Sequence, residues 1–166
     1  LEEKMHKCVY RIHDVPSEDK IHELRENLTG FGYKLAKGQV LRPKLFNQIL
    51  SKAKGTDSEE TINQLVLRSQ SQAEYSISNV GHFGLALARY AHFTSPIRRY
   101  SDLLVHRALI AASNFDAGKQ YSIADQQLED ICKHISQTER RAATAERAAN
   151  DRYLASFMKD KVGQTF

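Results

Sequence analysis

The sequence contains only two cysteines among its 166 residues, Cys8 and Cys132. They lie far apart in the chain and lack the short spacing of paired metal ligands. So few thiols are typical of a protein in a reducing compartment, and we expect neither a disulfide partner nor a cysteine-ligated metal. The seven histidines also lack a paired metal-ligand spacing, which favours structural or surface roles for them.

Long hydrophobic runs are absent as well. No stretch of the sequence is apolar over the length that a membrane span requires. The first ten residues carry too many charges for the apolar core of a signal peptide. We therefore expect a cytoplasmic protein with no membrane partner, although these residues carry no information on a targeting segment ahead of Leu1.

Acidic side chains are present but scattered. No two of the nine aspartates are closer than five residues, and they are Asp14, Asp19, Asp57, Asp102, Asp116, Asp125, Asp130, Asp151 and Asp160. A magnesium site usually needs one or two converging carboxylates together with a substrate phosphate, and a site with two metal ions needs several. The sequence therefore predicts no metal site within this chain.

Positive charge, in contrast, is concentrated in one segment. The length and the 41% hydrophobic content suit one soluble domain, and the net charge of +4 is compatible with a polyanionic partner. Residues 86–107 contain one acid, Asp102, and four arginines, which are Arg89, Arg98, Arg99 and Arg107. We expect a basic surface that is confined to this part of the protein.

The hydrophobic periodicity predicts a mainly α-helical fold with a few short strands. A short strand is expected within residues 7–13, and residues 77–93, which contain Gly81 and Gly84, are expected to form short extended pieces. Those glycines mark either a close approach of nucleic acid or tight packing inside the protein. Helices are expected at about 18–28, 43–54, 59–75, 96–112 and 123–159, the last capped by Ser122.

Three of these helices carry an apolar stripe at helical spacing, which predicts their buried faces. The third helix has Ile62, Leu65, Val66 and Ser69, and the fourth has Ile97, Tyr100, Leu104 and Ala108. The last helix continues its stripe along most of its length, through Leu128, Ile131, Cys132, Ile135, Ala142, Ala145, Ala149, Tyr153 and Phe157. We expect these residues to form the core.

The most informative segment precedes the fourth helix. Thr94 or Ser95 can cap that helix, and Pro96 suits its first position because proline has no amide hydrogen to lose. Arg98 and Arg99 would then lie in the first turn, where free amides and guanidinium groups together favour a bound phosphate. In the alternative interpretation, Asp102 simply neutralises one of these arginines from the next turn. The residues alone leave both open.

Two further groups of residues carry side chains that could take part in catalysis or ligand binding. Ser101, Asp102 and His106 do not indicate a hydrolase triad, because the strand-to-helix turn of such a nucleophile is missing around Ser101. Glu146 lies beside the alanine-rich half of the last stripe, where small residues allow a ligand or a helix to approach closely. Its carboxylate needs a partner there. A ligand and a salt bridge to Arg147, Arg152 or Arg99 both remain possible.

The segment HFTSPIRRYSDLLVHRAL resembles the signature of the ribonuclease II family, the RNB-domain 3′-to-5′ exoribonucleases, and is nearest the bacterial ribonuclease R branch. The similarity extends to YRIHDVPSEDKIHELRENLTGFG on one side and to TERRAATAERAANDRYLASFMKDKVGQTF on the other. It covers most of the chain but only the downstream half of the family's catalytic domain. The resemblance implies the helical C-terminal part of a mixed α/β domain, spanning residues 1–161, with 162–166 as the start of a linker to an S1-type RNA-binding domain.

The resemblance also implies roles for single residues. Arg98 matches the arginine that contacts the phosphate near the scissile bond, and Glu146 matches the glutamate beside the 3′-terminal nucleotide. Arg99, Thr94 and Ser95 are further candidates for substrate binding, and relatives can carry lysine at the position of Arg99. The family's aspartate cluster, which holds Mg²⁺, belongs to an upstream half that is missing here.

Three functions follow as alternatives. The resemblance implies that the parent enzyme degrades single-stranded RNA processively from its 3′ end and releases nucleoside 5′-monophosphates. We expect this chain, as a fragment without the metal-binding aspartates, to be inactive alone. A helical RNA-binding or interaction module without catalysis is the second alternative, and a purely structural helical domain with internally paired arginines is the third. Affinity for RNA that falls with rising salt separates the first two from the third.

Overall fold

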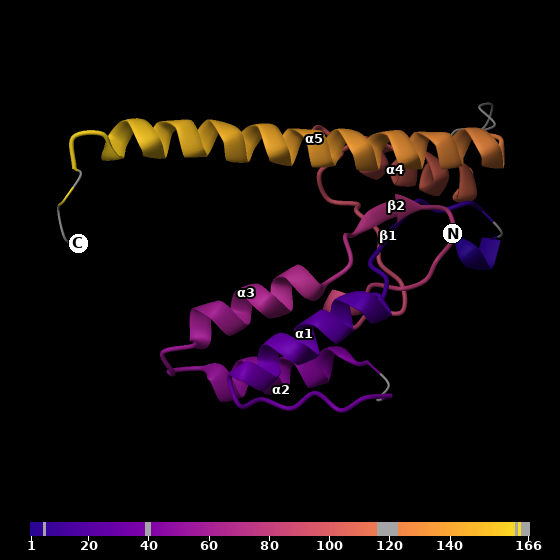
Figure 1. Cartoon of the computed structure of the whole chain (residues 1–166). Helices are drawn as coiled ribbons and strands as arrows, with labels where there is room; N and C mark the ends of the chain where they lie inside the picture. The colour runs from indigo at the N-terminus through magenta and orange to yellow at the C-terminus, as the bar shows by residue number, and fades with distance from the viewer. Residues whose placement is uncertain (5, 39–40, 116–122, 162, 164–166) are drawn as a thin grey trace.

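The computed structural model describes residues 1–4, 6–38, 41–115, 123–161 and 163 (Figure 1). Helices dominate it, as the periodicity predicts, and the only sheet among these residues has two short strands. The elements in chain order are η1 (Glu2–Lys4), β1 (Tyr10–Ile12), α1 (Glu18–Gly30), α2 (Pro43–Ala53), α3 (Glu59–Ser69), β2 (Glu74–Ser76), η2 (Phe83–Leu85), α4 (Tyr100–Ala112) and α5 (Asp125–Met158). In the part of the chain described, no helix is long and apolar enough to cross a membrane.

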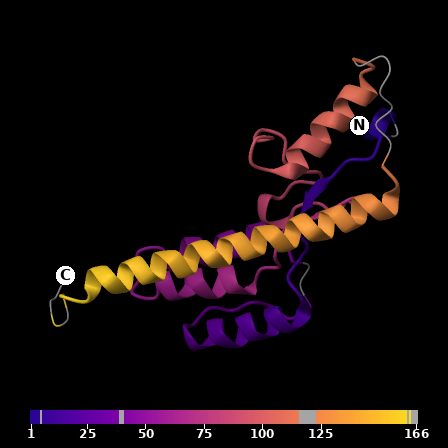
Figure 2. The same cartoon turned by 90° about the horizontal axis from the view of Figure 1, so that it is seen from above.

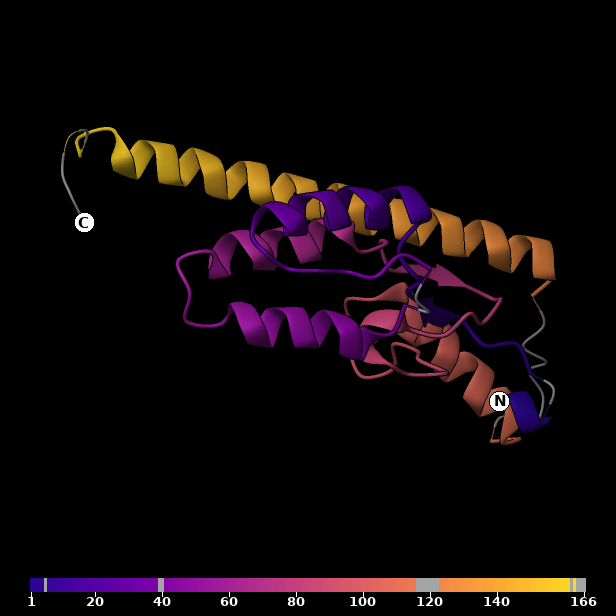
Figure 3. The ribbon, with the colours of Figure 1, turned by 60° about the horizontal axis from the view of Figure 1, so that its bottom comes forward.

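Helices α1, α2 and α3 form a small bundle below the rest of the molecule in Figure 1, and Figure 3 shows the same three helices from the front. The Ser17 hydroxyl accepts the amide of Lys20 and caps α1, while Pro43 occupies the first turn of α2. Their apolar faces meet in one core of Ile21, Leu24, Leu28, Leu35, Phe46, Ile49, Ala53, Ile62 and Val66. The burial of Ile62, Val66 and Ser69 confirms the stripe predicted for the third helix.

A second core lies between the sheet, α4 and the first half of α5. Strands β1 and β2 pair antiparallel, with Tyr10 opposite Ser76 and Ile12 opposite Glu74. The buried residues of this core are Val9, Tyr75, Leu104, Val105, Leu128 and Cys132. Helix α5 lies across the sheet and contacts β2 and α4, and its first half contributes Leu128 and Cys132 to this second core (Figure 2).

The second half of α5 corrects the prediction of a continuous buried stripe. Residues 139–158 of this helix are all exposed, and Tyr153 and Phe157 keep 78% and 62% of their surface. The end of the helix extends beyond α3 and contacts no other element in Figures 1 and 2. The apolar stripe is therefore present in the sequence, but only its first half, up to Ile135 and Ser136, meets other residues of the described chain.

Two predicted helix boundaries are also wrong. The third helix ends at Ser69 rather than near residue 75, because residues 74–76 pair with β1. The fourth begins at Tyr100 rather than Pro96, which leaves Ile97 fully exposed and Tyr100 44% exposed instead of buried. The predicted Ser122 cap and the predicted linker at 162–166 fall on residues outside the described part, apart from Gly163.

Gly84 marks a close approach inside the protein. Its amide donates to Nδ1 of His13 at 2.8 Å, and the other ring nitrogen lies 2.7 Å from the carbonyl oxygen of Ser71. A Cβ atom on Gly84 would lie 2.8 Å from that same Nδ1. Of the two roles left open for the glycines, tight packing against a neighbouring side chain is the one observed.

We predict that Gly84→Ala lowers the free energy of unfolding by about 1–3 kcal/mol, because the two hydrogen bonds prevent the His13 ring from moving aside. Urea denaturation followed by circular dichroism measures the change. Gly30→Ala is the matched control, since a Cβ there meets nothing within 4 Å. Equal stability of the two variants would contradict the packing role of Gly84.

Acid should weaken the fold before the carboxylates titrate. Burial, helped by nearby His13 and Arg11, lowers the pKa of His82 below its ordinary value of 6.5. Burial, helped by Arg99 and Arg11, lowers the pKa of His92 in the same direction. The folded state therefore binds fewer protons than the unfolded chain, and stability falls as the pH drops below about 6.5.

The urea midpoint is thus expected to be lower at pH 5.5 than at pH 7.5. His22→Gln, a change at an exposed histidine of α1, should retain this dependence. Replacing His92, whose Nδ1 lies 2.8 Å from the hydroxyl of Tyr75, should reduce it. A midpoint that stays constant or rises on acidification would contradict this account.

Candidate functional site

The segment between Thr94 and Arg99 is a tight turn held by one buried carboxylate. Oδ2 of Asp102 accepts the backbone amide of Ser95 at 2.7 Å and Nη2 of Arg99 at 2.9 Å. The Ser101 hydroxyl donates to Oδ1 at 3.2 Å. The carbonyl oxygen of Ser95 in turn accepts the amides of Arg98 and Arg99. Asp102 is completely buried, so the turn is anchored to the first turn of α4.

The ionised state of Asp102 depends on these donors. Burial by itself would raise the pKa of this carboxyl, but the amide of Ser95 and the guanidinium of Arg99 outweigh burial and hold the pKa below its ordinary value. Asp102 is therefore a carboxylate at neutral pH. Of the two interpretations left open, the one in which Asp102 neutralises an arginine holds for Arg99. The expected place of Arg98 and Arg99 in the first turn of the helix is wrong, because α4 begins at Tyr100.

Arg98 occupies a different position. It lies in the turn ahead of α4, it is exposed, and its side chain forms no hydrogen bond or ion pair with the residues described. The prediction that Thr94 or Ser95 caps this helix is wrong, because α4 begins at Tyr100 and Arg99 takes the N-cap position with no side-chain cap bond. The guanidinium of Arg98 is thus exposed to solvent, whereas that of Arg99 binds Asp102 and stabilises the turn.

A cleft of about 550 Å³ opens beside this turn. One wall is the segment 98–101, and the other is a face of α5 on which residues repeat at helical spacing. We name it the Arg98 cleft, and its lining residues are Tyr75, Arg98, Arg99, Tyr100, Ser101, Ile135, Thr138, Glu139, Ala142, Ala143 and Glu146. The small side chains of Ala142 and Ala143 keep the middle of the cleft open.

Four charged side chains line the Arg98 cleft, and two of them are already paired. Arg99 binds Asp102 at 2.9 Å. Glu139 receives both terminal nitrogens of Arg11, at 2.6 and 3.1 Å. Glu146, like Arg98, has no ion pair with the residues described. A cation and a carboxylate therefore remain available to a ligand on facing walls of one cleft.

The predicted site residues are thus only partly brought together. Arg98, Arg99 and Glu146, which are far apart in the sequence, line the same cleft. Thr94 and Ser95 do not line it, and Ser95 contributes through its amide to the turn. The salt bridges considered for Glu146 are absent among the residues described. The cleft leaves all five residues as candidates for substrate binding, with the first three in direct reach of a ligand.

The contacts of Arg11 and Tyr75 that join the strands to α5 beside the cleft were not predicted from the sequence. The guanidinium of Arg11 lies 4.7 Å from the centre of the Tyr75 ring while it binds Glu139. The Tyr75 amide donates to the hydroxyl of Ser136 at 2.9 Å, which fixes β2 to α5. No short-range pattern links these residues, since β1, β2 and α5 meet only in the fold. Tyr100 was expected to pack, yet its ring lines the cleft.

Residues 1–114 match the family model of the RNB domain. The chain belongs to the RNB family. Ribonuclease R of Aquifex aeolicus is 43% identical over 169 residues, which include all of this chain and 23% of that protein. This RNB chain therefore spans about a quarter of the length of that relative.

Solved structures agree in fold. Mycoplasma genitalium RNase R in complex with ribose methylated single-stranded RNA superposes with a TM-score of 0.88 and 30% identity over all of this chain and 27% of that one. The same protein in complex with double-stranded RNA gives a TM-score of 0.83. Yeast Ssd1, described as a pseudonuclease, gives a TM-score of 0.67 with 25% identity over 81% of this chain and 16% of that one.

The RNB family implies Mg²⁺, which would require carboxylates that converge on one point. In the described ranges, no three side chains of histidine, cysteine, aspartate or glutamate converge as a metal site would require. Beside the turn, the carboxylate of Asp102 already accepts three bonds, and Glu139 is bound by Arg11. Glu146 is then a single acid. The residues of the Arg98 cleft do not fit a resident magnesium ion.

Proposed function

We propose that this chain is the C-terminal part, residues 1–161, of the catalytic domain of an exoribonuclease. The full-length enzyme degrades single-stranded RNA processively from its 3′ end and releases nucleoside 5′-monophosphates. Membership of the RNB family supports the nuclease class, and the RNA complexes of a relative with the same fold support the substrate. The cytoplasm as the location belongs to the same proposal.

The observation that carries the proposal is that Arg98 and Glu146, neither of them ion-paired with the residues described, line the same cleft. A guanidinium binds a phosphate oxygen through charge-assisted hydrogen bonds. An ionised carboxylate only accepts hydrogen bonds, so it requires a donor on the ligand. A ribonucleotide at a 3′ end provides both, since its phosphate is anionic and its ribose hydroxyls donate. The two available groups of the cleft therefore match the two ends of one terminal nucleotide.

In this mechanism Arg98 acts on the phosphate and Glu146 positions the sugar. Negative charge builds on the phosphate oxygens while the last phosphodiester is cleaved, and a guanidinium already in place stabilises it. Asp102 contributes through the turn, because it keeps Arg99 occupied and leaves Arg98 directed outward. Since the cleft does not fit Mg²⁺, we propose that any metal of the enzyme is held by residues outside this chain, and we expect the chain alone to be inactive.

RNA binding by the chain itself tests the proposal. We expect a single-stranded RNA with a free 3′ hydroxyl to bind, with an affinity that falls as salt rises. Glu146→Gln should lower the affinity for this RNA more than it lowers the affinity for an RNA whose terminal hydroxyls are replaced by hydrogen. Arg107→Ala, which removes an exposed arginine of α4 outside the cleft, is the control. A folded chain without RNA affinity at low salt would contradict the proposal and favour a structural domain.

A second function is favoured by one observation. Yeast Ssd1 has the same fold over most of this chain and is described as a pseudonuclease. The alternative is therefore an RNA-binding module without catalysis, which would use the same basic turn to hold backbone phosphates. Release of nucleoside 5′-monophosphates by the purified full-length protein decides between the two.

A further inference from the structure

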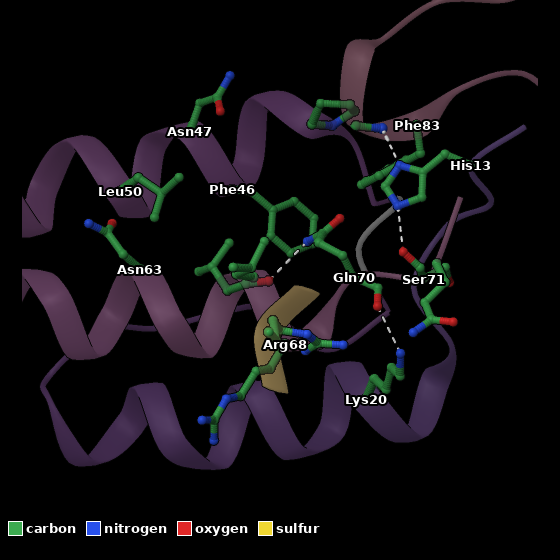
Figure 4. Close-up of a pocket in the computed structure, with 16 residues that line it drawn as sticks. His13, Lys20, Phe46, Asn47, Leu50, Asn63, Arg68, Gln70, Ser71 and Phe83 are labelled. Carbon is green, nitrogen blue, oxygen red and sulfur yellow. Dashed lines mark hydrogen bonds between the residues drawn. The ribbon is translucent and has the colours of Figure 1, made fainter. Parts of the chain in front are cut away.

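A second cleft lies along the α1–α3 bundle, with Arg147 of α5 at its edge (Figure 4). Its volume is about 860 Å³, which is larger than the Arg98 cleft. We name it the Arg68 cleft after the arginine at its edge. His13, which follows β1, closes one end of it together with η2 and the segment after α3, and its ring contacts Ser71 and Gly84 there.

The charge of this second cleft has one sign. Three of the described residues that line it carry a positively charged side chain, Lys20, Arg68 and Arg147, and no aspartate or glutamate is among the described lining residues. His13 uses both ring nitrogens within the protein. The side chain of Arg68 has no hydrogen bond or ion pair with the residues described, and Arg147 has only a long bond of 3.4 Å from Nε to the carbonyl oxygen of Ala143. Two guanidiniums are therefore uncompensated.

Lys20 adds a third donor. Its ammonium donates to the carbonyl oxygen of Gln70 at 2.8 Å, which places the charge at the cleft and leaves further N–H groups available (Figure 4). Cations that line one cleft without a counter-charge favour an anionic ligand. A simple anion would satisfy them, but it would leave the rest of the cleft unused.

The remaining wall is apolar and amide-bearing. Phe46, Leu50 and Phe83 line it. The rings of Phe46 and Phe83 pack edge to face, with their centroids 5.7 Å apart. Asn47 on α2 and Asn63 on α3 also line the cleft, near Leu50, and neither amide is hydrogen-bonded to a described residue (Figure 4). An amide both donates and accepts, as the edge of a nucleobase requires. Apolar surface, free amides and cations together suit a nucleotide better than an acidic peptide.

We infer that the Arg68 cleft binds a nucleotide segment of RNA, with its phosphates on Arg68 and Arg147 and a base against the apolar wall. The inference rests on the proposed function, because it takes RNA as the ligand. Helix α5 connects the two sites, since Glu146 lines the Arg98 cleft and its neighbour Arg147 lines this one. One helix thus carries a contact to the 3′ end on one face and a second contact to RNA on another.

Nuclear magnetic resonance separates the two sites. We expect titration of the isotope-labelled chain with a single-stranded oligonucleotide to shift the side-chain amide signals of Asn47 and Asn63. It should also shift the backbone signals of Ala142 and Ala143 in the Arg98 cleft. Shifts at the alanines alone would overturn the inference and leave the proposed function standing. No shifts at either site in a folded chain would overturn both.

Charge removal gives an independent readout. Arg68→Ala combined with Arg147→Ala should abolish the shifts of Asn47 and Asn63 and keep those of Ala142. The slope of log affinity against log salt should decrease by about 1.4, since each contact to a single strand contributes about 0.7. Arg141→Ala, an exposed arginine of α5 that does not line the cleft, should leave the Asn47 and Asn63 shifts intact. If poly-glutamate shifts the same amides at lower concentration than RNA, the cleft recognises an acidic polypeptide and the inference is wrong.

Discussion

Replacing Arg98 with alanine in the full-length enzyme is expected to lower kcat by a factor of about 10² to 10³, with a much smaller loss of RNA affinity. The guanidinium is exposed on a turn that Asp102 fixes, so its removal leaves the fold intact. Its charge matters most when negative charge builds on the phosphate, which is why the rate suffers more than binding. Single-turnover cleavage and equilibrium binding of the same RNA measure the two effects.

Arg98→Lys and Arg107→Ala complete this experiment. Lysine keeps the positive charge but cannot form bidentate hydrogen bonds with the phosphate, so Arg98→Lys should retain part of the kcat that Arg98→Ala loses. Arg107 is an exposed arginine of α4 outside the cleft, and its removal should leave kcat unchanged. Equal losses of rate and affinity for Arg98→Ala would contradict a role in the transition state and favour the RNA-binding module.

Asp102→Ala is expected to destabilise the chain by about 3–5 kcal/mol, the largest stability effect among the variants considered. The substitution removes the acceptor of Ser95, Arg99 and Ser101 at once. The guanidinium of Arg99 would then be left with no partner, since its Nε is already buried without one among the residues described. Urea denaturation measures the loss.

The stability comparison needs two further variants. Asp102→Asn retains one carbonyl acceptor for the amide of Ser95 and should cost less than Asp102→Ala. Asp151→Ala, which removes an exposed acid of α5, should change stability by less than about 0.5 kcal/mol. If Asp102→Ala and Asp151→Ala have the same free energy of unfolding, the carboxylate of Asp102 does not anchor the turn.

The sequence predicted the helices well because local signals mark their ends and faces. Ser17 and Pro43 define the starts of α1 and α2, and the stripe of Ile62 and Val66 is buried as expected. The start of α4 was misplaced for a physical reason. Pro96 is compatible with a helix, but the carboxylate of Asp102 captures the amide of Ser95 and holds residues 96–98 in a separate turn.

Part of the candidate site could likewise be predicted from the sequence, and part could not. The resemblance to ribonuclease II enzymes selected Arg98 and Glu146, and the structure places both on one cleft. Periodicity gave no means of finding Arg11 and Tyr75, because their contacts with α5 join segments that are far apart in the chain. The stripe at Tyr153 and Phe157 was correctly seen as apolar, yet a pattern cannot tell whether the surface it predicts is covered within the same chain.

Photo-crosslinking tests the central claim most directly. A single-stranded RNA with a 4-thiouridine as its 3′-terminal nucleotide is bound to the full-length protein and irradiated, and the linked peptide is identified by mass spectrometry. The account predicts links within residues 98–101 or 138–146, the two walls of the Arg98 cleft. Efficient linkage confined to other parts of the protein would contradict it.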